Sequence, residues 1–279
     1  MHCVSNTDMV CLSDLPLEIV REIVDNLQDD LPALKAGAQT CLSLLLLCRE
    51  HIFRTITLCP YYQQSIRSFA SLLDSNPQIA DYVRNLVYSQ LSDLQHLDCH
   101  VSQILDKFHR IQSFHFEGGD LIWSELDPRL RESISRIIHS VTRLNIQWVQ
   151  DFPISIFIPC INLIELKLKL FDCMVDDINS YEHEYCTPDV VPQLQSLTLN
   201  GHFATRFRRF DTLTTLVNAR RSEHVPVLDF SNLRILTFHI YHDGDRVALH
   251  ALMKVIEKLE TLSCKYYAGM YPIYLHFIN

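Results

Sequence analysis

The sequence predicts an α/β protein in which three short N-terminal helices precede a parallel β/α horseshoe solenoid. Helical periodicity in the first part of the chain and a short strand pattern that recurs eight times after it lead to this expectation. The strands also alternate apolar with polar residues, which indicates a sheet covered on one face only. We therefore expect a helical domain over residues 1–52 and a solenoid over residues 53–279.

The first helix is expected to start after Ser13 or Asp14, either of which can cap it, with Pro16 in its first turn. Its apolar residues form one stripe at helical spacing: Ile19, Val20, Ile23, Val24 and Leu27. A second helix is predicted near Leu31–Ala38 and a third near Leu42–Phe53. Because so small a domain is marginal alone, its surplus apolar surface needs a partner chain or the rest of this one.

Each strand repeat has an apolar residue, two variable residues, an apolar residue, one variable residue and a third apolar residue. Their starts lie 22 to 39 residues apart, mostly above the usual leucine-rich-repeat spacing, although the strand signature fits that class. The central apolar residues of the eight repeats are Ile56, Leu86, Phe114, Leu144, Leu166, Leu197, Leu236 and Leu262. These strands are expected to form ladders in a single sheet.

Helical periodicity separates several of the repeats, which predicts parallel strands with crossover helices. The ranges that show it are Leu94–Phe108, Leu130–Ile138, Phe203–Val217 and Val247–Ile256. Of the 24 strand positions that alternate with the apolar ones, only Cys59, Val87 and Ile235 are neither polar nor charged. One face of the sheet should therefore meet water. The acidic segment from Asp172 to Pro192 is expected to be an exposed loop.

The helical segment contains a spaced set of residues: Leu15-Pro16-x-Glu18-Ile19, Leu27, Leu31-x-x-Leu34, Cys41 and Leu47-Cys48-x-x-x-Ile52-Phe53. This set resembles the F-box, as found in the F-box proteins numerous in fungi, where the motif runs into a Phe-Arg-Thr-Ile-Thr-Leu strand. The resemblance implies docking on the Skp-family adaptor of cullin–RING ubiquitin ligases. The residues implied to contact the adaptor are Leu15, Pro16, Glu18, Ile19, Ile23, Leu27, Leu34, Cys41 and Leu44.

With its F-box bound to the adaptor and its leucine-rich-repeat-like domain bound to a protein target, such a chain would be a substrate-recognition subunit of an SCF-type ligase. It would not itself be an enzyme, because other subunits transfer ubiquitin. The alternative is a non-catalytic repeat scaffold with a degenerate F-box. Gln39 and Thr40 favour this alternative, since the family usually has an apolar pair there, and Leu44 stands where it often has Trp.

The target is expected to bind the concave strand positions of the middle repeats. The residues predicted to contact it are Arg143, Asn145, Glu165, Lys167, Lys169 and Thr198. Three cations in a chain with a formal net charge of −9 indicate an acidic or phosphorylated segment as the target. The alternative is that these are ordinary solvated strand positions, with Glu165 already neutralising a lysine.

Composition and motifs argue against several other functions. The acidic net charge disfavours nucleic acid and anionic membranes as partners, and no apolar run is long enough to span a bilayer. No catalytic or phosphate-binding motif appears, so neither an enzyme nor a cofactor is expected. The scattered cysteines predict a reducing compartment, cytosol or nucleus. His239 with His242, and His183 between Glu182 and Glu184, are better interpreted as surface residues than as metal ligands.

Overall fold

A computed structural model describes residues 15–59, 61–90, 98–169, 173–174, 190–199, 216–220, 225–240, 243–268 and 271–278. Its contacts divide the chain into two compact units, Met1–Thr55 and Ile56–Asn279, which we call the helical unit and the sheet unit. The division lies close to the boundary expected at residue 52. Each unit is described by itself below.

The helical unit contains three short helices at the positions that the sequence predicts: α1 (Leu17–Asn26), α2 (Leu31–Ala38) and α3 (Leu42–Ile52). Pro16 precedes the first turn of α1, while the expected caps Ser13 and Asp14 lie outside the described residues. Asp30 caps α2 by accepting a hydrogen bond from the Ala33 amide at 3.0 Å, which satisfies one of the free donors of the first turn.

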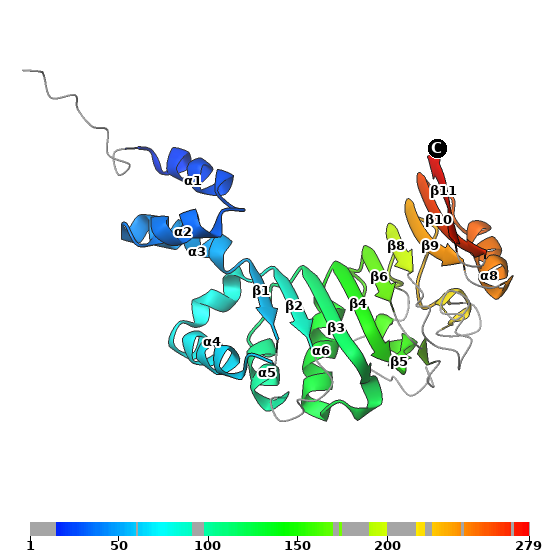
Figure 1. The fold of residues 1–279 in the computed structure, drawn as a ribbon, viewed down its shortest axis with the longest axis horizontal. Coiled ribbons are helices and arrows are strands. Elements are labelled where there is room, and N and C mark those ends of the chain that lie inside the picture. The colour runs from blue at the N-terminus through cyan, green and yellow to red at the C-terminus, as the bar shows by residue number, and fades with distance from the viewer. Residues whose placement is uncertain are drawn as a thin grey trace, which may run out of the picture. The chain divides into compact units, whose positions relative to one another are not determined.

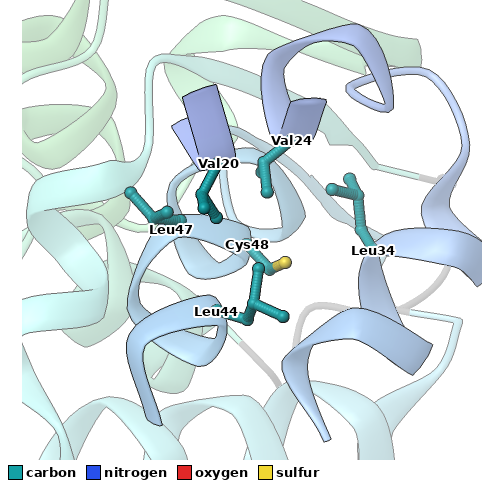
Figure 2. Packing of buried hydrophobic residues seen from close by; sticks show 6 residues of the cluster. All are labelled: Val20, Val24, Leu34, Leu44, Leu47 and Cys48. Atoms are coloured by element: carbon teal, nitrogen blue, oxygen red, sulfur yellow. The ribbon is translucent and has the colours of Figure 1, made fainter. Parts of the chain in front are cut away.

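Apolar side chains from all three helices form the core of the helical unit (Figure 2). The buried residues are Val20, Val24, Leu34, Leu44, Leu47 and Cys48. Near this core, the His51 Nε2 atom of α3 lies 2.9 Å from the Asp25 carboxylate of α1. Of the predicted α1 stripe, Val20 and Val24 are buried in this core, Leu27 is half-buried, and Ile19 and Ile23 are exposed. Successive helical residues differ by about 100° in direction, so one small core can bury only some of the residues of a stripe this wide.

All eight predicted strands form, and they pair in chain order within one open sheet (Figure 1). They are β1 (Thr55–Leu58), β2 (Asn85–Ser89), β3 (Ser113–Ile122), β4 (Arg143–Gln150), β6 (Glu165–Lys169), β8 (Ser196–Leu199), β9 (Ile235–Ile240) and β10 (Thr261–Ala268). Pairing from β2 to β10 is parallel, as predicted. A ninth strand, β11 (Tyr271–Ile278), which the sequence pattern does not predict, pairs antiparallel with β10.

The register brings the central apolar residues of the repeats into one buried row. Its members from β2 to β9 are Leu86, Phe114, Leu144, Leu166, Leu197 and Leu236, none more than 1% exposed. From the alternation, five residues are expected to be exposed on the opposite face: Asn85, Arg143, Glu165, Ser196 and Thr237. Only Arg143 is exposed, because neighbouring strands half-bury the other four. The strands therefore alternate as predicted, and one face of the sheet is covered.

Helices of the sheet unit lie between successive strands, and Figure 1 shows α4, α5 and α6 on one side of the sheet. The helices are α4 (Gln63–Ser75), α5 (Asp98–Leu105), α6 (Pro128–Ser140) and α8 (Asp243–Met253). The pattern predicts α5, α6 and α8 but not α4. Most of the helix expected over Phe203–Val217 falls outside the described residues. This open, mostly parallel α/β arrangement is consistent with a horseshoe solenoid.

Shorter elements complete the connections of the sheet unit. Within the described residues these include the 3₁₀ helices η2 (Pro77–Tyr82), η4 (Trp123–Glu125) and η5 (Ile154–Phe157). The last of these occupies the shortest interval between repeats, which leaves little room for a longer helix. Within the segment expected to be a loop, β7 (Cys173–Met174) pairs with β5 (Phe152–Pro153), whereas 172 and 175–189 lie outside the described residues.

A bulge interrupts the β3–β4 pairing between Glu117 and Leu121. A Cβ atom on Gly118 would lie 2.7 Å from Val149 Cγ2 and 2.8 Å from the Trp148 carbonyl oxygen. Because part of this clash is with backbone, Gly118→Ala should destabilise the sheet unit by about 1–3 kcal/mol in urea unfolding. Gly37→Ala in α2 is the control, since its Cβ would meet only Cys48 Sγ at 3.4 Å. Equal or greater stability of Gly118→Ala would contradict this account of the bulge.

Candidate protein-binding surfaces

The helical unit presents six large apolar side chains to solvent, from 37% to 71% exposed. They are Leu17, Ile19 and Ile23 of α1, Leu31 of α2, and Leu42 and Leu46 of α3. We call this set the outer apolar surface. Ile19 and Ile23 lie one turn apart on α1, as do Leu42 and Leu46 on α3, and exposed apolar residues grouped in this way are typical of a surface that another chain covers.

The nine residues predicted to contact an adaptor differ in how far they are buried. Pro16, Glu18, Ile19, Ile23 and Cys41 are exposed, and Leu15 and Leu27 are half-buried against the core. Leu34 and Leu44 need correction, because they are 1% and 8% exposed and support the fold of the unit instead of offering a contact. The prediction omitted Leu17, Leu31, Leu42 and Leu46 as contacts. The last two lie one turn apart on α3, a spacing that could have identified them.

Polar residues occupy the turn between α2 and α3. Gln39 and Thr40 are both exposed, and the Thr40 hydroxyl donates a hydrogen bond to the Gly37 carbonyl oxygen at 2.8 Å. The next two residues, Cys41 and Leu42, are exposed as well. The polar pair is therefore adjacent in sequence to part of the outer apolar surface.

Cys48 lies beneath this turn in the core. Burial, and to a lesser extent the nearby Cys41, raises the pKa of its thiol above the ordinary value. A protonated, buried thiol is a poor nucleophile. His51, three residues later, is instead paired with Asp25. Packing, not covalent catalysis, therefore accounts for Cys48.

The six predicted target-contact residues lie together on the uncovered face of the sheet, which we call the open face. In register, Arg143 is beside Glu165 and Asn145 is beside Lys167. Lys167 is in turn beside Thr198 of β8. Neighbouring strands lie about 4.8 Å apart, so these side chains form one continuous surface.

Two of the open-face lysines already have partners. Lys167 Nζ lies 2.7 Å from Glu165 Oε1, with the two side chains 48% and 27% exposed. An ion pair in such a position contributes about 0–1 kcal/mol and cancels most of its own field. Lys169 Nζ lies 3.8 Å from the centre of the Trp148 ring. For Lys167, the structure thus agrees with the alternative in which Glu165 neutralises a lysine.

His115 lies on the same face of β3, beside Asn145 in register. Its Nε2 atom is buried and has no hydrogen-bond partner. Burial lowers the pKa of His115 below its ordinary value of 6.5, and the opposing effect of Glu117 is smaller. The Glu117 carboxylate accepts a hydrogen bond from the Ser89 hydroxyl at 3.0 Å.

This environment predicts a pH dependence of stability. As the pH falls below about 6.5, the unfolded chain protonates this histidine before the folded chain does, so the unfolded state binds more protons. The free energy of unfolding should therefore decrease between about pH 7.5 and pH 5.5, and His115→Gln should make that decrease smaller. Urea titrations at both pH values test this, with exposed His109→Gln as the control. The same decrease in His115→Gln as in the wild type would contradict it.

The described residues contain no group of three or more His, Cys, Asp or Glu side chains that could hold a metal ion. Glu182, His183, Glu184 and His242 lie outside the described residues, as does the side chain of His239. A polar groove of about 370 Å³ lies between α5 and α6, but its Asp106 is already bonded to Arg136 at 2.6 Å and to Ser133 at 2.7 Å. In the part of the chain that is described, no helix is long and apolar enough to cross a membrane.

The fold and these surfaces define an α/β protein with an open, mostly parallel sheet, an apolar surface on its helical unit and a polar open face on its sheet unit. Comparison with protein-family models gave no match, and neither did a search of curated proteins. A functional assignment therefore depends on the residues of this chain.

Proposed function

We propose that this chain is a substrate-recognition subunit of an SCF-type cullin–RING ubiquitin ligase. The helical unit is an F-box that docks on the Skp-family adaptor, and the sheet unit is a leucine-rich-repeat-like solenoid that binds a protein target. The observation that carries the proposal is the outer apolar surface, which lies on the three helices that contain the F-box-like residue spacing. The protein acts by binding the adaptor and a protein target, in the cytosol or nucleus.

Energetics favour a docking role for these helices. Over its described residues, the helical unit has six buried side chains in its core, whereas as many large apolar side chains remain exposed. Fully burying an apolar side chain contributes about 1.5–3 kcal/mol, and these six are about half exposed, so covering all of them contributes about 5–9 kcal/mol toward binding, against about 8 kcal/mol for a micromolar complex. Pro16, Glu18 and Cys41 are exposed and adjacent in sequence to Leu17 and Leu42 of this surface.

The second candidate function is a protein-binding scaffold whose F-box no longer docks on the adaptor. Exposed Gln39 and Thr40 favour it, because two polar side chains in an apolar contact lose hydrogen bonds to water without replacement. Under this alternative, the double substitution Gln39→Leu with Thr40→Leu would create adaptor binding that the natural chain lacks.

Affinity purification of the tagged full chain from cells that supply the adaptor and cullin tests the proposal. We expect the Skp-family adaptor, and through it the cullin, to co-purify at near-stoichiometric amounts by quantitative mass spectrometry. The scaffold alternative would instead be established by two results. The natural chain would co-purify with protein targets but without the adaptor, and the Gln39→Leu/Thr40→Leu variant would co-purify with the adaptor.

A further inference from the structure

The open face has an unusual backbone position near the carboxyl ends of β3 and β4. Trp148 has φ of 58°, a left-handed conformation that is rare for a bulky residue. Two residues, instead of one, separate the fully buried Ile146 from the fully buried Val149 of β4. Trp148 is the extra residue, and its indole lies under the Lys169 ammonium instead of in the core. The strand thus places a half-buried aromatic ring next to the open face.

Only some of the charged side chains on this part of the open face form ion pairs. Lys167 is paired with Glu165, but neither Arg143 nor Lys169 forms an ion pair within the part of the chain that is described. The nearby Glu117 carboxylate is bonded to Ser89 of β2, on the side of β3 away from β4. Arg143, and Lys169 with its ammonium against the Trp148 ring, therefore have positive charges that no described carboxylate neutralises, in a chain whose net charge is −9.

The spacing of these two cations indicates the kind of ligand that fits them. Arg143 is level with Glu165, and Lys169 is four residues further along the neighbouring strand. Their Cα atoms are therefore about 14 Å apart, from a rise of about 3.3 Å per residue and a strand separation of about 4.8 Å. At this separation each cation can pair with an anionic group of its own. Two carboxylates four residues apart in an extended peptide span about 13 Å and match it.

We propose that the open face over β4 and β6 binds an extended acidic segment of the protein target, in which two Asp or Glu side chains four residues apart pair with Arg143 and Lys169. Trp148 supplies an apolar contact to a side chain between them, because a rigid, partly buried aromatic ring gives contact area at little entropic cost. This inference rests on the proposed function in one respect only, namely that the sheet unit is the target-binding unit.

The local potential can be tested without any ligand. The chain has two tryptophans, so Trp123→Phe leaves Trp148 as the only one, and Trp123 itself is buried. We expect iodide to quench Trp148 fluorescence more strongly than caesium does, because positive charge concentrates anions locally. Lys169→Gln should remove most of that difference, whereas exposed Lys254→Gln should not. Caesium quenching equal to or stronger than iodide quenching would overturn the inference.

Binding can be tested with synthetic peptides as probes. A 12-residue labelled peptide with two glutamates four residues apart and a leucine between them is compared with its lysine and phosphoserine analogues by fluorescence anisotropy. We expect the glutamate peptide to bind the full chain, and Arg143→Glu with Lys169→Glu to weaken it at least about tenfold, since two attractive contacts become repulsive. A double variant of exposed cations outside the open face, Arg129→Glu with Lys254→Glu, has the same charge change and should bind within about twofold of the wild type.

Every outcome of the peptide experiment is informative. Equal binding of the lysine and glutamate peptides, or equal weakening by both double variants, would overturn the inference. If the phosphoserine peptide binds more tightly than the glutamate peptide, the preferred ligand carries phosphates instead of carboxylates. That result would overturn the inference that the target segment pairs through Asp or Glu. Adaptor binding is measured on the same variants. If the natural chain binds the adaptor but not the glutamate peptide, this inference alone is rejected. If the natural chain does not bind the adaptor, the proposed function is rejected.

Discussion

Replacing Leu34 by alanine should destabilise the helical unit by about 2–5 kcal/mol, which is enough to unfold a unit this small. Leu34 is 1% exposed and packs with Val20, Val24 and Cys48 in the only core that the described part of the unit contains. Removing its side chain leaves a cavity that three short helices cannot easily close. Hydrogen exchange of the α1–α3 amides in the full chain measures the loss directly.

Leu31→Ala is the matched control for this experiment. It makes the same change in side chain one turn earlier on α2, at a position that is 43% exposed. We expect its effect on stability to be within about 0.5 kcal/mol. If Leu34→Ala and Leu31→Ala leave the helical unit equally stable, then Leu34 is not a core residue, and the earlier prediction of Leu34 as an adaptor contact regains its basis.

The double substitution Ile19→Asp with Ile23→Asp should abolish adaptor binding while leaving the fold intact. Both side chains are exposed on α1, so carboxylates there remain solvated in the free chain. In a complex that covers them, each carboxylate would be buried without a partner, at a cost of several kcal/mol. An affinity loss of more than about 100-fold is therefore expected in a titration of the purified adaptor.

Ile161→Asp with Ile164→Asp provides the control for that change. These two isoleucines belong to the sheet unit and are also exposed, so the variant has the same charge and composition as the first. It should bind the adaptor with the affinity of the natural chain. Full adaptor binding by Ile19→Asp/Ile23→Asp, with its helices intact by circular dichroism, would exclude α1 from the docking surface.

The sheet could be predicted from the sequence because its signal is strong and repeated. Each strand has apolar residues two positions apart, such as Leu166 and Leu168 of β6, with polar residues between them. This pattern fixes both the secondary structure and the covered face. The pairing of Lys167 with Glu165 fits the alternative in which Glu165 neutralises a lysine, since the two residues lie two positions apart on one face of one strand.

Two elements escaped prediction. Helix α4 was overlooked although Ile66, Phe69, Ala70 and Leu73 recur at helical spacing, so the sequence pattern that identifies a helix was present. Strand β11 reads Tyr-Pro-Ile-Tyr-Leu-His-Phe-Ile, and its Ile273, Leu275 and Phe277 alternate with Tyr274 and His276. It starts only three residues after the end of β10, whereas the predicted repeats start 22 to 39 residues apart, so it does not fit the repeat on which the prediction depended.

Which residues of the three short helices face the core also could not be derived from periodicity. Helix α3 contains five leucines in its first six residues, so nearly every direction around it is apolar. Packing against α1 and α2 determines that Leu44 and Leu47 are buried while Leu42 and Leu46 are exposed. The left-handed backbone of Trp148 was equally inaccessible, because it depends on the bulge in the neighbouring strand β3.

Isothermal titration calorimetry of the full natural chain with a purified Skp-family adaptor tests the central claim most directly. The account predicts saturable one-to-one binding with a negative change in heat capacity, because binding removes the outer apolar surface from water. It also predicts that this heat capacity change is smaller in a Leu42→Ser/Leu46→Ser variant. The absence of saturable binding by the natural chain, with its helices folded, would contradict the account.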